Sequence, residues 1–284
     1  MSENLQQPMP NTYDAWLLEA SLALEKHGIP SPRLDAEIIL AHTIRKGRTY
    51  IHAHGENVLS DRDREIANAR IDLRTDRVPI AYIIGHKEFY GRRFNVSSST
   101  LIPRPESEAV IDLASSLLPT NLSLFDDDYR VVDVGSGSGN LGITMKLEHP
   151  ELDVSLVDIS PYALKVAASN ASRLSADVRM IRSDLLSQYP FVPNMIIANL
   201  PYVDPEWQRS PETDHEPSLA LFADDSGMAL IKKLLDQASL LQSSGGFVLL
   251  EADPEQHLPL TTYALKRGYE FISTKDYAFA LKKT

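Results

Sequence analysis

The 284-residue sequence contains no cysteine. It can therefore form no disulfide, no thiolate metal site and no cysteine nucleophile. It also has no apolar run of about 18 residues, so no membrane-spanning helix is predicted. The first ten residues, MSENLQQPMP, lack the basic and then apolar order of a signal peptide. These absences favour a cytoplasmic protein that works in a reducing environment.

Basic residues are outnumbered, since 28 Lys and Arg stand against 39 Asp and Glu and the formal net charge is −11. Residues 1–104 carry 14 basic and 13 acidic residues, whereas the remaining 180 carry 14 and 26. Long nucleic-acid contacts need clustered Lys and Arg to replace phosphate counterions, so we expect no stable nucleic-acid binding. Five arginines of the first part are interpreted as the solvated face of a helix. They are Arg62, Arg64, Arg70, Arg74 and Arg77.

The sequence has enough apolar residues, 43%, for a packed core, and enough length for one large and one small domain. Helical spacing predicts helices over 12–28, from Pro32, and from Ser60 to about Arg77. Aromatic residues on both sides of Gly91 predict a two-stranded hairpin, and a proline-containing linker follows it. We therefore predict three parts: a helical domain at 1–80, a β-hairpin and linker at 81–105, and a larger domain at 106–284.

In the larger domain, predicted strands alternate with predicted helices. The strands are expected at 131–134, 154–157, 178–182, 195–198 and 247–251, with two short strands closing the chain. This alternation predicts an α/β fold, a doubly wound parallel sheet with helices on both faces. Ligands of such sheets bind outside the carboxyl ends of the strands. Four polar residues stand at such ends and should border one crevice: Asp133, Asp158, Asp184 and Asn199.

A glycine-rich loop, Gly135-Ser136-Gly137-Ser138-Gly139, separates the first of these strands from its helix. Glycine permits the sharp turn and lets a ligand lie against the backbone. Asp158 follows the next strand, where a carboxylate can accept hydrogen bonds from two ribose hydroxyls. Both features indicate a nucleotide-like cofactor. The loop differs from the G-x-G-x-x-G pattern of dinucleotide-binding proteins. This difference favours S-adenosyl-L-methionine over NAD, because S-adenosyl-L-methionine has no pyrophosphate to bind.

The stretch Asn199-Leu200-Pro201-Tyr202 follows the fourth strand of this series. The Asn199 side-chain oxygen and the Leu200 carbonyl can each accept an N–H from a planar NH₂ group, and Tyr202 can stack on its plane. An amide nitrogen is a poor nucleophile because its lone pair is delocalised, and holding both hydrogens on one side turns the lone pair toward a methyl donor. Such catalysis works by orientation and electrostatics and needs no metal.

The Asn-Leu-Pro-Tyr stretch resembles the N-[PIL]-P-Y signature of methyltransferases that act on planar nitrogen. Over nearly its whole length the chain is similar to the protein-(glutamine-N5) methyltransferases of peptide chain release factors. Four stretches carry this similarity: Leu34–His42; Pro79–Gly85 with Glu88 and Phe89; Thr100–Glu108; and His215–Leu221 with Asp225–Met228. The stretch Thr100–Glu108 is the most specific, since general methyltransferases lack it.

The resemblance implies a Rossmann-like class I methyltransferase domain that uses S-adenosyl-L-methionine to methylate the glutamine of the Gly-Gly-Gln motif of release factors. It implies that Asn199, Pro201 and Tyr202 are catalytic and that Asn199–Tyr202 bind the glutamine amide. The cofactor would contact Gly135, Ser136, Gly137, Ser138, Gly139, Asp158, Asp184, Leu185 and Asn199. The helical domain would provide a second contact surface for the release factor, and the hairpin and Thr100–Glu108 would shape the cleft.

Two departures from the family pattern keep alternatives open. Leu200 stands where release-factor enzymes usually have proline, and the Asn-Leu-Pro-Tyr form also resembles rRNA adenine dimethyltransferases. The segment 276–281 lacks the charged turn that usually precedes the last strand in this family. A shortened hairpin would explain this difference. A glutamine of a ribosomal protein, an adenine amino group of nucleic acid, and a silent binding module therefore remain alternatives. We expect a monomer, because no segment suggests a dedicated dimer face.

Overall fold

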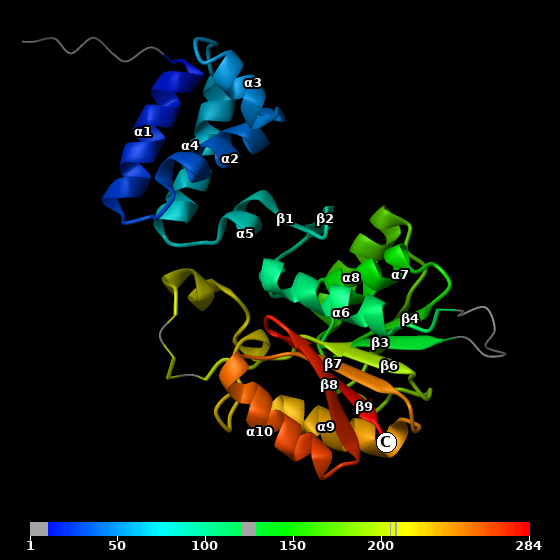
Figure 1. Cartoon of the computed structure of the whole chain (residues 1–284). Coiled ribbons are helices and arrows are strands. Elements are labelled where there is room, and N and C mark those ends of the chain that lie inside the picture. Colours follow the sequence, from blue (N-terminus) through cyan, green and yellow to red (C-terminus); the bar gives the residue numbers. More distant parts are fainter. Residues whose placement is uncertain (1–10, 121–128, 205, 208) are drawn as a thin grey trace, which may run out of the picture. The chain divides into compact units, whose positions relative to one another are not determined.

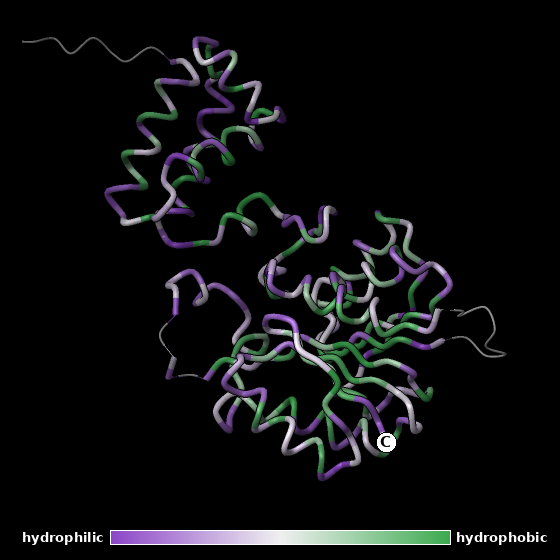
Figure 2. Tube along the Cα trace, in the orientation of Figure 1, coloured by the Kyte–Doolittle hydropathy of each residue, from purple (hydrophilic) through white to green (hydrophobic). Residues whose placement is uncertain are grey.

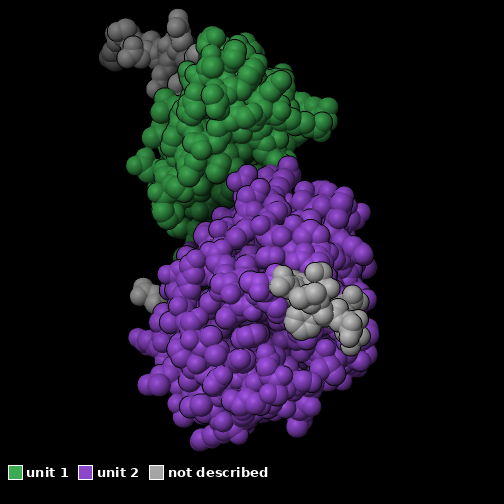
Figure 3. Space-filling model, turned by 45° about the vertical axis from the view of Figure 1, so that its right-hand side comes forward, with its two compact units in different colours: residues 1–85, 211–215 green, residues 86–210, 216–284 purple. Residues whose placement is uncertain are grey.

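The computed structural model describes residues 11–120, 129–204, 206–207 and 209–284. These residues form two units (Figure 3). The first, here called the helical unit, contains residues up to Gly85 together with Pro211–His215. The second, here called the sheet unit, contains His86–Ser210 and Glu216–Thr284. The chain thus leaves the sheet unit after residue 210, contributes five residues to the helical unit, and returns.

The helical unit consists of α1 (Tyr13–Lys26), α2 (Pro32–Ile44), α3 (Arg48–Ala53), α4 (Asp61–Thr75) and α5 (Ile80–Ile84). The predicted helices correspond to α1, α2 and α4, whose starts are explained by local chemistry. The Thr12 and Ser60 side chains cap α1 and α4, and proline occupies the first position of α2. The short helices α3 and α5 were not predicted, because five or six residues carry too little periodicity to detect.

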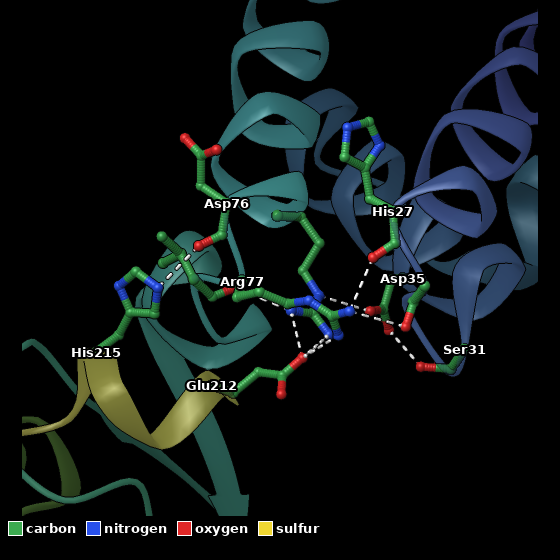
Figure 4. Close-up of polar contacts among 10 residues, drawn as sticks. His27, Ser31, Asp35, Asp76, Arg77, Glu212 and His215 are labelled. Atoms are coloured by element: carbon green, nitrogen blue, oxygen red, sulfur yellow. Dashed lines mark hydrogen bonds and ion pairs between the residues drawn. The ribbon is translucent and has the colours of Figure 1, made fainter. Parts of the chain in front are cut away.

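The core of the helical unit is a cluster of buried apolar residues from α1, α2 and α4, among them Trp16, Leu17 and Leu40. Beside this core lies Arg74, which is 6% exposed. Its guanidinium donates to Asp35 at 2.8 Å and to Glu212 at 3.0 Å. Arg77 also pairs with Glu212 (Figure 4). The interpretation of the arginines as a solvated helix face is therefore wrong for Arg74.

The segment 211–215 is the short 3-10 helix η3 (Pro211–His215), and two of its side chains bind α4 and the turn that follows it. Besides the ion pairs of Glu212, the His215 ring nitrogen Nε2 lies 2.8 Å from the Asp76 carbonyl oxygen (Figure 4). This segment comes directly after the region of the Asn-Leu-Pro-Tyr stretch in the sequence. No local pattern predicted its place in the helical unit, because the contacts join residues more than 130 positions apart.

The sheet unit contains a seven-stranded sheet in the order β5-β4-β3-β6-β7-β9-β8. Its strands are β3 (Arg130–Val134), β4 (Asp153–Asp158), β5 (Arg179–Arg182), β6 (Met195–Ala198), β7 (Phe247–Glu251), β8 (Tyr269–Lys275) and β9 (Ala278–Lys283). The first five strands are parallel and β9 runs antiparallel to β7. A tight turn at Asp276 and Tyr277 joins β8 to β9, so the short C-terminal hairpin is present.

Helices cover both faces of this sheet (Figure 1). The helices α6 (Glu108–Leu117), α7 (Asn140–Glu148) and α8 (Pro161–Leu174) share one apolar core with it. The helices α9 (Ala229–Leu241) and α10 (Pro254–Leu265) share the other. Buried strands appear as the continuous hydrophobic stretches at the centre of this unit in Figure 2. A strand covered on both faces is mostly apolar, which explains the continuous apolar runs at 195–198 in β6 and 247–250 in β7.

The predicted hairpin is present as β1 (His86–Phe89) and β2 (Arg92–Asn95), antiparallel across a turn at Tyr90 and Gly91. The linker after it ends in the 3-10 helix η1 (Pro105–Ser107), which runs into α6. A further 3-10 helix, η4 (Ser218–Ala220), follows the segment that belongs to the helical unit. The predicted α/β fold is correct.

Candidate active site

A cavity of about 390 Å³ opens at the carboxyl ends of β3, β4 and β6, within the sheet unit. The chain runs outward from β3 in opposite directions across the sheet, because β4 and β6 lie on its two sides. The strand ends diverge at such a switch point and leave room for a ligand. The lining includes nearly all of the residues predicted for the site: Asp133, Gly135, Ser136, Gly137, Ser138, Asp158, Asp184, Leu185, Asn199, Leu200 and Pro201.

The glycine loop closes one side of the cavity. Its first residue has φ +72°, and an added Cβ there would lie 2.7 Å from Leu200 Cδ2, so Gly135 meets both a conformational and a spatial requirement. The Gly135 and Ser136 amides donate to the Val157 carbonyl at 2.8 and 3.0 Å. Gly139 ends the loop as the N-cap of α7 and does not line the cavity. The loop is therefore held to β4 before any ligand binds.

Asp158, at the end of β4, is held by backbone donors on both oxygens. Oδ2 accepts from Gly137 N at 2.9 Å and Oδ1 from Ser160 N at 2.8 Å. Burial raises the pKa of this carboxyl, and the backbone amides oppose that shift. Each oxygen keeps a lone pair for another donor. The carboxylate can therefore bind hydroxyl groups in the cavity without first having to be oriented.

Two other lining residues carry buried oxygens that have no hydrogen-bond partner among the residues described: Asp133 Oδ1 and Ser136 Oγ. Asp133 is 1% exposed, and burial raises the pKa of its carboxyl to about 7. Its other oxygen accepts from Gly142 N at 2.8 Å. Buried polar atoms without a partner are costly, so these two atoms fit a cavity whose ligand is itself polar.

Asp184 and Leu185 lie on the cavity wall after β5. Leu185 is buried and has φ +52°. The carboxylate of the exposed Asp184 pairs with Lys233 Nζ at 2.6 Å. Their place is compatible with the predicted contact to the cofactor, because Leu185 offers apolar surface and Asp184 a rim acceptor.

The Asn199–Tyr202 stretch closes the opposite side of the cavity from the end of β6. The Asn199 amide nitrogen donates to Ser107 Oγ at 2.9 Å. Leu200 and Pro201 line the cavity, whereas Tyr202 does not and turns its hydroxyl to Glu251 at 3.1 Å. Burial and the neighbouring Glu251 raise the pKa of the Tyr202 phenol. The tyrosine is thus present as the neutral phenol, held by its oxygen.

Part of the remaining wall comes from two stretches that are far apart in the sequence. Leu101, Pro103 and Arg104 come from the linker, and Leu219 and Ala220 come from η4. Glu216, which precedes η4, joins these two stretches through its carboxylate. It accepts from Ile102 N at 3.1 Å and pairs with the Arg104 guanidinium, and it is 7% exposed.

The family models find two matches in this chain. Residues 15–85 match the PrmC N-terminal domain, and residues 106–214 match the methyltransferase small domain. A release factor glutamine methyltransferase from Salmonella typhimurium is 36% identical over 272 residues, which cover 93% of this chain and 95% of that protein. The chain belongs to the release factor glutamine methyltransferase family. The resemblance predicted from the four stretches is confirmed.

Other members of the family are similar over comparable lengths. The release factor glutamine methyltransferase of Escherichia coli K12 is 35% identical over 93% of this chain and 95% of its own. That of Koribacter versatilis is 38% identical over 81% of this chain and 84% of its own. Membership and the methyltransferase domain confirm that this protein is an S-adenosyl-L-methionine-dependent methyltransferase.

Solved structures support the fold of the family member. A methyltransferase from Pyrococcus furiosus superposes with a TM-score of 0.50 at 18% identity, covering 75% of this chain and 95% of that one. The hMettl16 catalytic domain in complex with MAT2A 3'UTR hairpin 6 gives 0.52 at 13% identity, covering 79% and 82%. At these identities the likeness concerns the fold alone. Among the described residues, no helix is long and apolar enough to cross a membrane.

Sequence reasoning missed three residues that contact the predicted site: Ser107, Glu216 and Glu251. Ser107 and Glu216 lie within stretches that carried the family resemblance, so their importance was visible but their contacts were not. Glu251 gave no signal beyond its place at a strand end. Each contact joins side chains at least 49 positions apart, which no local pattern reports.

Proposed function

We propose that this protein transfers the methyl group of S-adenosyl-L-methionine to the side-chain amide nitrogen of the glutamine in the Gly-Gly-Gln motif of peptide chain release factors. The observation that carries this proposal is the position of Asn199. It lies at the end of β6 on the wall of a cavity whose other side is the glycine loop and Asp158, in a chain of the release factor glutamine methyltransferase family.

The residues present fit such a cofactor. Asp158 would accept from ribose hydroxyls, Leu185 and Asp184 would flank the adenine, and the loop Gly135–Gly139 would lie against the remainder. The unpartnered oxygens of Asp133 and Ser136 would meet its polar groups. When bound, the cofactor supplies a methyl group on a sulfonium sulfur, which is a good leaving group.

Asn199 would hold the substrate amide by accepting one of its hydrogens at Oδ1, and the Leu200 carbonyl would accept the other. Pro201 follows Leu200 and restricts its backbone, and Tyr202, which does not line the cavity, would approach the amide plane from its fixed place. Orientation of this kind removes much of the entropic cost of the reaction, up to roughly 7–11 kcal/mol in well-oriented systems. No strong base is required for the attack.

We assign the helical domain at 1–80 to recognition of the release factor, the hairpin and linker at 81–105 to shaping the cleft, and residues 106–284 to catalysis. This proposed substrate supports a cytoplasmic enzyme, because release factors act where translation terminates. We propose that it acts as a monomer without stable nucleic-acid binding, which the net charge of −11 supports.

A methyl-transfer assay tests the substrate directly. Labelled S-adenosyl-L-methionine is mixed with the protein and, separately, a bacterial release factor, its Gln→Ala version in the Gly-Gly-Gln motif, a ribosomal protein and a structured RNA. We expect label on the wild-type factor only. Label on the RNA or on the ribosomal protein instead would refute the release-factor assignment in favour of an adenine or a different glutamine.

A further inference from the structure

Two buried polar side chains lie beside the Asn199–Tyr202 stretch, and the reaction described above makes no use of them. Ser107 comes from η1 and Glu251 from the end of β7, and each is 1% exposed. Ser107 Oγ accepts a hydrogen bond from the Asn199 amide nitrogen at 2.9 Å, and Glu251 Oε1 accepts one from the Tyr202 hydroxyl at 3.1 Å. One residue of the substrate-binding stretch thus rests on each of them.

Ser107 and Glu251 also complement one another. Glu251 Oε2 is buried and has no partner in hydrogen-bonding geometry among the residues described. The Ser107 and Asn199 side chains nevertheless lower the pKa of Glu251 against the larger effect of burial, so both face its carboxyl group. The Ser107 hydroxyl accepts from Asn199 and has its own proton to donate. Oε2 is the acceptor that lacks a donor.

The chemistry of these groups gives the chain of contacts a direction. A carboxylate only accepts hydrogen bonds, so a hydroxyl beside it donates to it and accepts from its other neighbour. The Asn199 amide must then direct Nδ2 to Ser107, which leaves Oδ1 toward the cavity. Without such a neighbour the two ends of an asparagine amide are nearly equal in shape, and either could face the ligand.

We propose that Glu251 and Ser107 are positioning residues that fix the Asn199 amide with Oδ1 toward the substrate and that Glu251 also holds Tyr202 by its hydroxyl. This inference rests on the proposed function, since it assumes that Asn199 Oδ1 accepts from the glutamine amide. An inverted asparagine would direct an NH₂ group at the substrate NH₂ and would repel what it has to bind.

The first turn of α10 supports the same stretch from its backbone side. Gln256 Nε2 donates to the Tyr202 carbonyl at 2.9 Å and to the Ser226 carbonyl at 2.7 Å. The oxygen of the same amide accepts from Asp253 N in a capping box. Tyr202 is therefore fixed at its hydroxyl by the end of β7 and at its carbonyl by the helix that follows. The two elements form one support for the substrate-binding stretch.

The substitution Glu251→Gln tests the direction of the contacts with little change in shape. A glutamine amide can donate to Ser107, which reverses the serine and lets it donate to Asn199 Oδ1. We expect kcat for release-factor methylation to fall about tenfold to a hundredfold, as for other groups that orient a functional residue, with the Kd for S-adenosyl-L-methionine unchanged. Ser107→Ala should lower kcat similarly, and Ser107→Thr, which keeps the hydroxyl, should restore most of it.

The pH profile of kcat provides a readout that a merely structural role would not move. Protonation turns the Glu251 carboxyl into a possible donor, so wild-type kcat should fall at acid pH, and the fall should be absent in Glu251→Gln. The ionisable groups that face this region are Glu106, which disfavours the charge on Glu251, and Tyr202, with Tyr277 and Asp253 beside the phenol. The Tyr202 phenol, whose pKa is raised, remains neutral over the acid range and cannot produce the limb.

Matched variants separate the possible failures. Glu270→Gln, on the exposed part of β8, removes the same charge elsewhere and should keep wild-type kcat. Loss of activity in Asn199→Ala together with full activity in Glu251→Gln and Ser107→Ala would overturn the positioning role alone. Full activity in Asn199→Ala would overturn the orienting role of Asn199 on which this inference rests, whereas absence of label on the release factor with the wild-type protein would overturn the proposed function itself. If the contacts act as one unit, the Ser107→Ala and Glu251→Gln double variant should be no slower than the slower single variant.

Discussion

At the scale of single residues, three buried carboxyl groups in or near the cavity have a raised pKa: Asp133, Asp158 and Glu251. Burial raises the pKa of each, and the contacts that oppose burial differ. Asp158 has two backbone donors that support its charge, whereas Asp133 has one. A group supported by fewer donors is the one most affected by pH.

Asp133 should therefore make folding stability depend on pH. Its pKa in the folded state is about 7 against 3.8 for the ordinary carboxyl, so the folded state binds the extra proton between these values. Stability from this group falls as pH rises from about 4 to 7, by up to about 4 kcal/mol. In urea unfolding of the cofactor-free proteins, the free energy of unfolding of Asp133→Asn should rise relative to that of wild type as the pH increases across that range. Parallel curves for the two proteins would contradict the assignment.

At the scale of elements, the sheet provides the strand ends and the connecting segments close the site. The residue after β6, the 3-10 helix before α6 and the end of β7 meet at Asn199, Ser107 and Glu251. The backbone of Gly227 approaches the backbone of Tyr202 closely. Gly227 has φ +80°, and an added Cβ there would lie 1.9 Å from the Tyr202 carbonyl oxygen.

Gly227→Ala should therefore shift Tyr202 and lower methylation at least tenfold, because backbone rather than a movable side chain blocks the new methyl group. The left-handed backbone itself costs an alanine about 1–2 kcal/mol. Gly245→Ala is a matched control, since its φ is +88° with nothing within 4 Å of the added Cβ. Both variants should lose similar stability from backbone strain, but only Gly227→Ala should have a lower kcat than wild type. Equal kcat in the two variants would refute this account.

The two wall stretches of the cavity should separate when Glu216 is removed. Glu216→Ala leaves Ile102 N and the Arg104 guanidinium without their acceptor, and the wall of the cavity loses its link. We expect the Kd for S-adenosyl-L-methionine to rise about tenfold, corresponding to about 1.4 kcal/mol, measured by calorimetric titration. Glu151→Gln, in an exposed turn, should bind as wild type does. An unchanged Kd in Glu216→Ala would show that the link is dispensable for the cofactor.

At the scale of the whole molecule, one segment belongs to a unit other than that of its neighbours in the chain. Residues 211–215 lie in the helical unit, where Glu212 completes the charge balance of Arg74 and Arg77. The same Arg74 neutralises the buried Asp35 at 2.8 Å. The stability of the helical unit therefore depends on a segment that the sequence places after the active-site stretch.

Arg74→Met should destabilise the helical unit strongly, because Asp35, 5% exposed, loses its principal cation. Removal of one partner from a buried ion pair typically costs about 3–5 kcal/mol. Thermal unfolding followed by circular dichroism should show this loss, with Arg62→Met, an exposed arginine of the same helix, as the control. Equal unfolding temperatures for the two variants would contradict the structural role of Arg74.

The sequence by itself determined the order and type of most elements, the parallel sheet, and the strand-end position of the candidate site residues. These features follow from periodicities within 5 to 15 residues and from the rule that parallel strands end at one edge. It also carried the family resemblance, including the stretches Thr100–Glu108 and His215–Leu221, without showing what they touch.

Only the tertiary structure decided which side chains meet. The burial of Arg74, the placement of 211–215 in the helical unit, the link of Glu216 to the linker, and the support of Asn199 and Tyr202 by Ser107 and Glu251 all join distant residues. The reason is physical: a carboxylate or a guanidinium looks the same in a sequence whether solvent or a buried partner neutralises it, and only the folded packing selects between them.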